Sequence, residues 1–298
     1  VRPPDAVGFE IHFLQAYVGR VFGGIVPEDM DPAIGGPQSQ TRRRRGHAHQ
    51  PVDLGLIAEN PRATGGVGSR LHPLTEDRAK PAVPFGGKYR IIDFTLANCL
   101  HSDMRKILVL TQYRSHSLHK HLRDGWSIFN PELGEYITAV PPQMRKGGEW
   151  YAGTADAIYQ NMFLLQRSHA RNVLVLSGDH IYRMDYAAML EFHVQHDAVA
   201  TLACMEVGLD EARSFGVVSV DPEQRILTFE EKPDEPRGLP DNPQCALASM
   251  GIYVFNREKL VDVLSKTDYQ DFGREIFPAS IRAQHVQLHL FDGYWEDI

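Results

Sequence analysis

The stretch that decides the fold is Val173-Leu174-Val175-Leu176-Ser177-Gly178-Asp179-His180. Four apolar residues are followed by a serine, a glycine and a carboxylate. Because the run is apolar on both faces of a pleat, it is typical of a strand buried in a parallel sheet. The runs 54–58 and 107–110 are also apolar on both faces and predict two more such strands.

The segments between these runs space their apolar residues three and four apart, as amphipathic helices do: 94–100, 115–122 and 155–165. The alternation predicts an α/β fold, with a mostly parallel mixed sheet covered by helices on both faces. In such a fold the ligand crevice lies at the carboxyl ends of the strands. Later in the chain, 217–220 and 226–229 flank a Pro-containing turn and predict a hairpin.

Composition narrows the class of protein. The 298 residues are 43% hydrophobic and 23% charged, which is typical of soluble globular chains. The net charge of −7 argues against a nucleic-acid partner, and no apolar run approaches the roughly 18 residues of a membrane helix. Three cysteines without a C-x-x-C pair favour a reducing, cytoplasmic setting. Residues 1–51 are rich in Gly and Pro and predict a disordered leader, so the folded domain is expected over 52–298.

A glycine-rich loop is the first candidate for binding chemistry. In 65–70, closely spaced glycines would let backbone N–H groups approach phosphate oxygens, and Arg70 would add a forked donor. Lys80 follows within ten residues, and Pro81 restricts the backbone beside it. Converging cations would suit a triphosphate. A plain turn with solvated surface cations is the alternative interpretation.

Two further motifs follow predicted strands. Asp179 comes directly after the strand 173–176, where a carboxylate would suit Mg²⁺; a strand-end turn is the alternative. Glu231 and Lys232 follow the end of the predicted strand 226–229. There the lysine could hold a phosphate, and the glutamate could accept hydrogen bonds from sugar hydroxyls. An exposed ion pair explains them equally well.

Three histidines, His116, His119 and His121, share one predicted helix. The neighbouring cations Lys120 and Arg123, together with the expected absence of carboxylates close to the three rings, argue against a metal site there. We therefore interpret the three as a polar helix face.

Taken together, the motifs closely resemble the bacterial glucose-1-phosphate adenylyltransferases. The resemblance covers residues 65–298 in the expected order. It rests on seven segments: 65–75, 78–94, 150–157, 177–182, 229–233, 248–255 and 294–297. The long block from Lys80 to Phe94 is highly specific.

The resemblance implies a glycosyltransferase-A-like nucleotidyltransferase domain. It would transfer the adenylyl group of ATP to α-D-glucose 1-phosphate, giving ADP-glucose and pyrophosphate for glycogen synthesis, with Mg²⁺ as cofactor. The implied ATP-binding residues are Gly66, Gly68, Arg70 and Lys80. The implied metal ligands are Asp179 and Asp297, and Arg70, Lys80 and Asp179 are implied to be catalytic. The residues implied to hold glucose 1-phosphate or ADP-glucose are Tyr151, Gly216, Glu231, Lys232 and Ser249.

The resemblance also sets expectations about the whole protein. Family members continue into a left-handed β-helix domain and form homotetramers, and no such domain follows Asp297 here. We therefore expect a truncated catalytic domain, whose assembly and activity are open. Two alternatives to an active enzyme of this specificity are a catalytically weak regulatory subunit and a pyrophosphorylase for another nucleotide or sugar.

Overall fold

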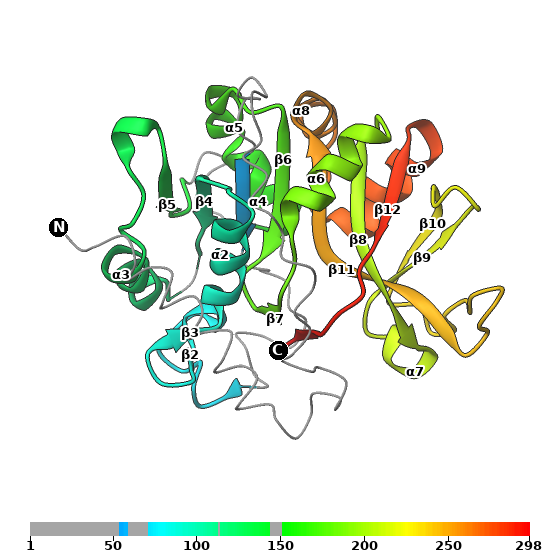
Figure 1. Cartoon of the computed structure of the whole chain (residues 1–298), viewed down its shortest axis with the longest axis horizontal. Coiled ribbons are helices and arrows are strands. Elements are labelled where there is room, and N and C mark those ends of the chain that lie inside the picture. Colours follow the sequence, from blue (N-terminus) through cyan, green and yellow to red (C-terminus); the bar gives the residue numbers. More distant parts are fainter. Residues whose placement is uncertain (1–53, 59–70, 113, 144–150) are drawn as a thin grey trace, which may run out of the picture. The chain divides into compact units, whose positions relative to one another are not determined.

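The computed structural model describes residues 54–58, 71–112, 114–143 and 151–298 (Figure 1). The expected leader and the predicted loop residues Gly66, Gly68 and Arg70 lie outside the described residues. Among the residues that the structure describes, no helix has the length and apolarity needed to cross a membrane.

Internal contacts divide the chain into two units. One unit is Val1–Gln50 with Pro84–Tyr89, and the other is Pro51–Val83 with Arg90–Ile298. A separate two-stranded ladder pairs β2 (Pro84–Phe85) with β3 (Tyr89–Arg90). The fold and the candidate site described below belong to the second unit.

A mixed sheet forms the framework of the second unit. In the described part of the chain it has nine strands, in the order β10-β9-β11-β6-β1-β4-β5, with β8 beside β11 and β12 beside β8. The strands are β1 (Leu54–Ala58), β4 (Lys106–Leu110), β5 (Tyr136–Val140), β6 (Asn172–Ser177), β8 (Ala200–Gly208), β9 (Gly216–Val220), β10 (Ile226–Glu231), β11 (Cys245–Asn256) and β12 (Val286–Leu290).

The two halves of this sheet differ in strand direction. Strands β6, β1, β4 and β5 are parallel, and Leu56 pairs with Leu108 on one side and Val175 on the other. Strand β11 runs antiparallel to β6, β8 and β9 and so joins the two halves. The predicted buried parallel strands and the predicted hairpin, β9 with β10, are confirmed.

Helices follow the strands along the chain. The α-helices are α2 (Ile92–His101), α3 (His116–Gly125), α4 (Thr154–Gln160), α5 (Met162–Ser168), α6 (Tyr186–Gln195), α7 (Leu209–Ala212), α8 (Arg257–Lys266) and α9 (Phe277–Ala283). The shorter turns are η2 (Lys80–Ala82) and η3 (Pro131–Leu133), which are 3₁₀, and η4 (Phe272–Ile276), which is π-helical.

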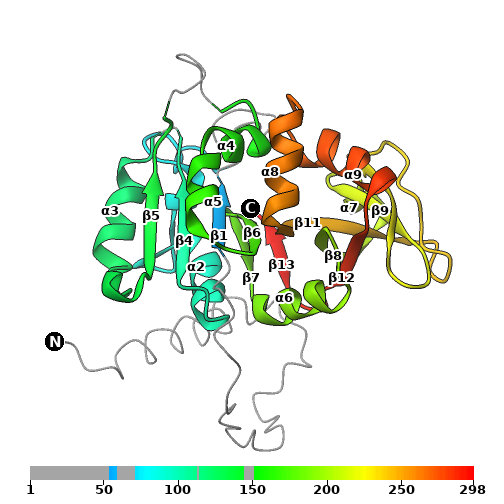
Figure 2. The same cartoon turned by 90° about the horizontal axis from the view of Figure 1, so that it is seen from above.

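Burial on both faces of β6 explains its unbroken apolar run. Val173 and Val175 pack in one cluster with side chains of α4, α5 and α8, whereas Leu174 and Leu176 pack in another with α2 and α6. Alternate residues of a strand point to opposite faces, so each face needs its own helical cover. Figure 2 shows these helices on the two sides of the sheet. The prediction of helices on both faces is confirmed.

Two local expectations were wrong. The segment 155–165 is not one helix, because it breaks at Asn161, whose side-chain amide donates to the carbonyl of Ala157 and to the hydroxyl of Tyr151. The expected absence of a carboxylate near the three histidines was also wrong, because Nε2 of His121 lies 2.6 Å from Oδ1 of Asp93 and its side chain is only 15% exposed. The helix turns His121 toward a carboxylate that is distant in sequence.

Candidate active site

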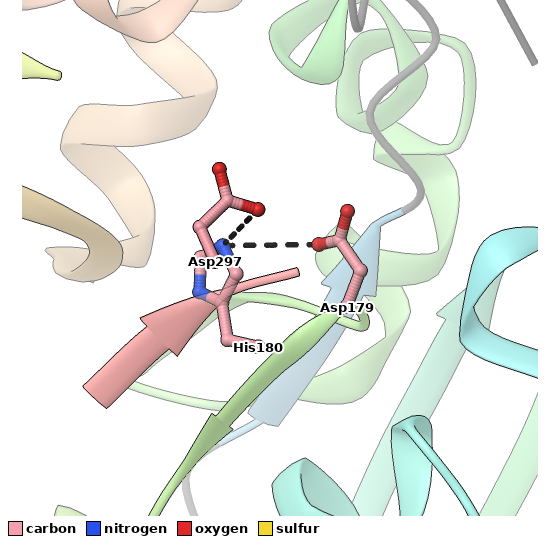
Figure 3. A group of neighbouring side chains, drawn as sticks. All are labelled: Asp179, His180 and Asp297. Carbon is pink, nitrogen blue, oxygen red and sulfur yellow. Dashed lines mark ion pairs between the residues drawn. The ribbon is translucent and has the colours of Figure 1, made fainter. Parts of the chain in front are cut away.

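Two short strands bring the predicted carboxylates together. Asp179 lies two residues after the end of β6 and directly before β7 (His180–Tyr182), as expected for a residue at the carboxyl end of a parallel strand. Strand β13 (Trp295–Asp297) pairs antiparallel with β7, and its register places Asp297 opposite His180. Figure 3 shows that the carboxylates of Asp179 and Asp297 both lie near the same ring nitrogen of His180, Nε2.

Lys80 joins both carboxylates. Its Nζ lies 2.8 Å from Oδ2 of Asp179 and 3.4 Å from Oδ1 of Asp297. Lys80 begins η2, and the next residue, Pro81, packs against Gly178: a Cβ added at Gly178 would lie 3.3 Å from Cγ of Pro81. The glycine beside Asp179 thus permits the close approach that brings Lys80 over the carboxylates.

The environment of Asp179 favours its ionised form. Burial alone would raise the pKa of the carboxyl, but His180 and Lys80 act in the opposite direction, together with hydrogen bonds from Lys80 and Ser177. The net effect is a pKa lowered from its usual value. Asp179 therefore carries its negative charge at physiological pH.

The donor set fits a divalent cation. Within the described residues, ligand atoms of Asp179, His180 and Asp297 all lie within 4.8 Å of one another. Two converging carboxylates are protein ligands of the kind that Mg²⁺ and similar hard cations use. Asp179 and Asp297 are the residues that could hold such an ion, and Lys80 adds a cation at the same place.

A second group of predicted residues lies where β9 and β10 meet. Gly216 begins β9 and pairs with Glu231 at the end of β10. A Cβ at Gly216 would lie only 2.3 Å from Cζ of Phe229 and 3.2 Å from Oε2 of Glu231, so only glycine fits there. Lys232 follows with φ +52°, and its backbone N–H donates to the carbonyl of Phe215 at 2.9 Å. These contacts define the backbone around both charged residues.

Glu231 differs from Asp179 in its electrostatics. Burial raises the pKa of its carboxyl, Asp271 raises it further, and Lys232 and Arg274 oppose the shift. The net effect is a raised pKa. A half-buried carboxyl of this kind is a suitable acceptor for hydroxyl hydrogen bonds.

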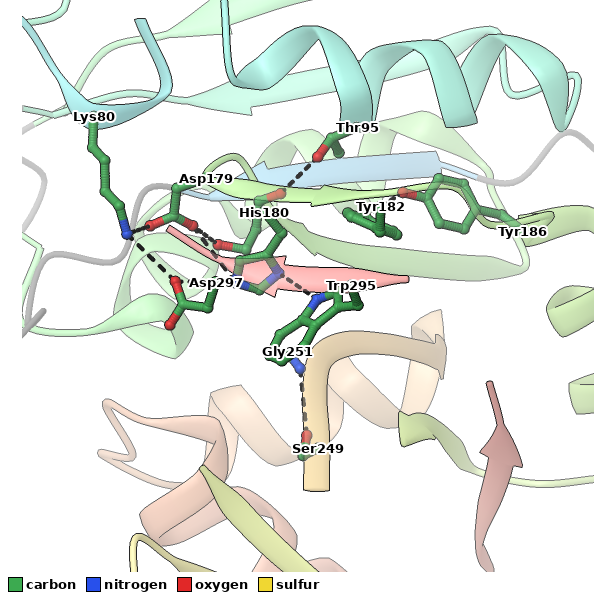
Figure 4. A network of polar contacts seen from close by, with 11 residues as sticks. Lys80, Thr95, Asp179, His180, Tyr182, Tyr186, Ser249, Gly251, Trp295 and Asp297 are labelled. Atoms are coloured by element: carbon green, nitrogen blue, oxygen red, sulfur yellow. Dashed lines mark hydrogen bonds and ion pairs between the residues drawn. The ribbon is translucent and has the colours of Figure 1, made fainter. Parts of the chain in front are cut away.

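Ser249 connects to the carboxylate cluster through a bulge in β11. Its Oγ accepts from the backbone N–H of Gly251 at 3.4 Å, and Gly251 has φ +70°. A Cβ at Gly251 would lie 3.3 Å from Cε1 of His180. Figure 4 shows Ser249 and Gly251 beside the ring pair of His180 and Trp295.

Tyr151 lies in the core. It is 4% exposed, and its hydroxyl accepts from the side-chain amide of Asn161 at 2.9 Å. Its assignment to the sugar phosphate therefore stays a prediction.

Sequence reasoning assigned no role to His180 or Trp295. Both belong to quoted motifs, next to Asp179 and Asp297, so proximity to those carboxylates was an available signal. The pairing of β7 with β13 decides on which side of these two strands the side chains of His180 and Trp295 lie.

Fold and site together define a class of protein. A carboxylate at the end of a parallel strand, a second one on a distant ribbon and a lysine between them suit the transfer of a phosphate-linked group. The family model for nucleotidyl transferases matches residues 64–298, and the chain belongs to this family.

More specific relatives support the resemblance seen in the motifs. The chain is 61% identical to glucose-1-phosphate adenylyltransferase 2 of Vibrio vulnificus over 248 residues, which cover 78% of this chain and 61% of that protein. It is 49% identical to glucose-1-phosphate adenylyltransferase of Rhodopirellula baltica, over 78% of this chain and 55% of that one. The chain thus spans less than two thirds of the length of these relatives. Its similarity to this enzyme group is confirmed.

Proposed function

We propose that this chain transfers the adenylyl group of ATP to α-D-glucose 1-phosphate, releasing pyrophosphate and forming ADP-glucose. The single observation that supports this most strongly is the convergence of Lys80, Asp179 and Asp297 from three separate segments. The names of the relatives supply the substrates, which the geometry alone would not specify. We place the reaction in cytoplasmic glycogen synthesis.

The chemistry requires positioning more than proton transfer. The phosphate of glucose 1-phosphate is already anionic near neutral pH, so its oxygen can attack the α-phosphorus without a dedicated base. Asp179 and Asp297 would hold Mg²⁺, which neutralises phosphate charge when bound. Lys80, whose ammonium lies 2.8 Å from Asp179, would stabilise charge on the departing pyrophosphate. Gly66, Gly68 and Arg70 would contact the ATP phosphates.

The sugar phosphate would bind on the antiparallel half of the sheet. We assign it to Tyr151, Gly216, Glu231, Lys232 and Ser249. Close packing of Gly216 on Glu231 supports this assignment, because it positions a hydroxyl acceptor whose pKa is influenced by the charge of the next residue, Lys232.

The test is pyrophosphate release by the purified chain from ATP and α-glucose 1-phosphate with Mg²⁺. We expect release that requires both substrates and that fails in Asp179→Asn. Release no faster than in that variant would contradict the enzyme and favour a catalytically weak regulatory subunit. Faster release with another nucleoside triphosphate or another sugar phosphate would indicate a pyrophosphorylase of different specificity.

A further inference from the structure

The two carboxylates of the candidate site lie on a ribbon outside the main sheet. In the described part of the chain, β7 and β13 pair only with each other and do not join the nine-stranded sheet. Asp179 directly precedes β7, and Asp297 ends β13. A two-stranded ribbon by itself is at best marginally stable in water. Other elements must therefore hold the two carboxylates in place.

A stripe of polar side chains on α2 faces this ribbon. Thr95, Asn98 and Ser102, the C-cap of the helix, are spaced three and four residues apart and so lie on one side of it. We call these three residues the α2 stripe. They are 0%, 4% and 7% exposed, and apolar neighbours such as Leu96 and Cys99 pack in the core. Buried polar groups cost free energy unless they are hydrogen-bonded, so the stripe requires polar partners.

The partners are main-chain atoms in and after β7. The side-chain amide of Asn98 donates to the carbonyl of Tyr182 at 3.2 Å, and its Oδ1 accepts from the backbone N–H of Met184 at 3.3 Å. Oγ of Ser102 accepts from the backbone N–H of Tyr186 at 2.8 Å. Asn98 therefore bonds to the chain at the end of β7 and again two residues later.

Thr95 contacts the turn that carries Asp179. Its Oγ1 donates to the carbonyl of Ser177 at 3.0 Å (Figure 4). The hydroxyl of Ser177 in turn donates to Oδ1 of Asp179. Thr95 thus fixes the residue that orients the carboxylate.

The bonds to β7 also bear on the second carboxylate. Tyr182, whose carbonyl accepts from Asn98, pairs with Trp295 of β13. Asp297 lies opposite His180 at the other end of the same short ladder. A displacement of β7 would therefore displace β13 and Asp297 with it.

We propose that Thr95 and Asn98 are positioning residues for the carboxylates of Asp179 and Asp297, and that they act through the backbone of β7 and of the turn before it. Because the stripe bonds to main-chain atoms, the carboxylate oxygens stay available to a cation. A fully bonded polar network of this kind specifies one arrangement of the ribbon, which apolar packing alone would not. The consequence for metal binding rests on the proposed function, whereas the anchoring of the ribbon does not.

The first experiment measures the anchoring by hydrogen exchange of the metal-free full chain. Thr95→Val keeps the branched shape of the side chain and removes the hydroxyl. We expect the amides of β7 and β13 to exchange roughly tenfold faster relative to those of β4, because a lost hydrogen bond favours local opening. Thr95→Ser keeps the hydroxyl and should exchange as the wild type does.

Thr201 of β8 supplies a matched control. It is 0% exposed, as Thr95 is, and its Oγ1 lies 2.8 Å from Nδ1 of His193. Thr201→Val therefore removes a buried hydroxyl hydrogen bond outside the ribbon. It should leave the exchange of β7 and β13 unchanged relative to β4. If Thr95→Val accelerates β7, β13 and β4 equally, or accelerates none of them, the proposal is overturned.

Asn98→Ala is a stronger perturbation, because it removes two bonds to the ribbon. We expect it to accelerate exchange of β7 and β13 more than Thr95→Val does. Wild-type exchange in a folded Asn98→Ala variant would overturn the role of Asn98. If this variant does not fold, Thr95→Val still decides the proposal, since its change in volume is small.

The second experiment measures binding of Mn²⁺ alone, by electron paramagnetic resonance. Thr95→Val should bind Mn²⁺ roughly tenfold more weakly, as expected when a residue that orients a metal ligand is lost. Thr95→Ser and Thr201→Val should stay within about threefold of the wild type. Wild-type Mn²⁺ affinity in Thr95→Val would overturn the positioning role, because a purely structural residue would leave the metal site unchanged.

The pyrophosphate assay separates this proposal from the proposed function. Thr95→Val should lower kcat and raise the Mg²⁺ concentration needed for half-maximal rate, with the KM for glucose 1-phosphate changed less than about twofold. A wild-type chain that binds Mn²⁺ and releases no pyrophosphate would refute the proposed function and leave the positioning result standing. A wild-type chain that binds no Mn²⁺ would refute the metal role of the carboxylates, and hydrogen exchange would still decide the anchoring.

Discussion

Charge compensation around Asp179 is the main feature at the scale of single residues. Lys80, Ser177 and His180 come from different positions along the chain and all act on this one carboxylate. Their combined effect exceeds the cost of burying the charge, so the pKa of Asp179 falls where burial alone would raise it. A buried carboxylate kept ionised in this way is ready to bind a cation.

Asp179→Asn should reduce turnover at least roughly 100-fold while the fold stays intact, because asparagine keeps the shape and the acceptor oxygen but removes the charge that a divalent ion needs. The measurement is pyrophosphate release across a Mg²⁺ titration, with circular dichroism of each variant. The control is Asp185→Asn, at the residue that caps α6 by accepting from the backbone N–H of Ala187. Asparagine caps equally well, so activity should persist. Near-normal activity of Asp179→Asn would make Asp179 a structural turn residue.

Lys232→Ala should raise the Michaelis constant for glucose 1-phosphate roughly tenfold or more, equivalent to at least about 1.4 kcal/mol, because its charge is assigned to the sugar phosphate. The constant for ATP should change much less. Lys266→Ala is the comparison, since Lys266 makes an exposed ion pair with Asp262 and should leave both constants unchanged. An equal loss for both substrates in Lys232→Ala would refute the assignment.

Glu231 gives a prediction about pH and stability. Burial raises its pKa in the folded state above the usual 4.5, so the folded protein holds this proton at a pH where the unfolded chain releases it. Stability from this group is therefore fully present below about pH 4.5 and is lost as pH rises through the folded pKa. Glu231→Gln cannot titrate, so its stability relative to wild type should increase over that window. Urea unfolding at a series of pH values measures this, and a difference that does not vary with pH would contradict it.

At the scale of elements, one loop supports the start of a helix. The carbonyl of Gln270 accepts from the backbone N–H groups of Ala155 and Asp156, at 3.1 and 3.3 Å, in the first turn of α4. Glu275 in turn accepts from the N–H of Gln270 at 2.7 Å. The N-terminal N–H groups of a helix lack partners inside the helix, so this contact satisfies two of them from a distant segment.

Gly153 is the residue that permits this contact. A Cβ there would lie 2.0 Å from the carbonyl oxygen of Gln270, so Gly153→Ala should displace the loop and cost about 2 kcal/mol of unfolding free energy. At Gly208, an added Cβ has nothing within 4 Å and φ is −63°. Gly208→Ala should therefore be close to neutral. Urea unfolding of both variants is the measurement, and equal losses would show that the close approach has no energetic effect.

At the scale of the whole molecule, β11 connects the parallel and antiparallel halves of the sheet in the second unit. Val254 pairs with Leu174 of β6 on one side and with Thr201 of β8 on the other. A strand hydrogen-bonded into both halves should make them unfold together. The carboxylates at the end of β6 and the predicted sugar residues of β9 to β11 are then parts of one cooperative structure.

Val254→Ala tests this coupling. Val254 is fully buried, and its truncation should cost about 2 kcal/mol. The loss should be the same in hydrogen exchange of β4 amides and of β8 amides, because both report global unfolding. Val194 is 56% exposed on α6, and Val194→Ala should change neither. A loss confined to β8 would show that the two halves open independently.

Much of the fold was predictable because its signals are local. Three apolar runs became β1, β4 and β6, since burial on both faces requires apolar residues at every position. The break at Asn161 was not predictable from periodicity, because the apolar residues on both sides of it keep helical spacing. The side-chain hydrogen bond of Asn161 at the end of the first helix depends on the folded conformation, which the spacing of residues does not reveal. His121 was misjudged because its partner, Asp93, is close only in space.

The sequence by itself determined the class of fold, the position of Asp179 at the end of a buried strand and the set of motifs that mark a nucleotidyl transferase. Only the tertiary structure decided that Asp297 lies opposite His180, that Lys80 joins both carboxylates and that Trp295 bonds Nδ1 of His180. The buried strands are indicated by short apolar runs, which can be seen in the local sequence alone. The site depends on the register between β7 and β13 and on the direction of single side chains, which are set by contacts between residues far apart in the chain.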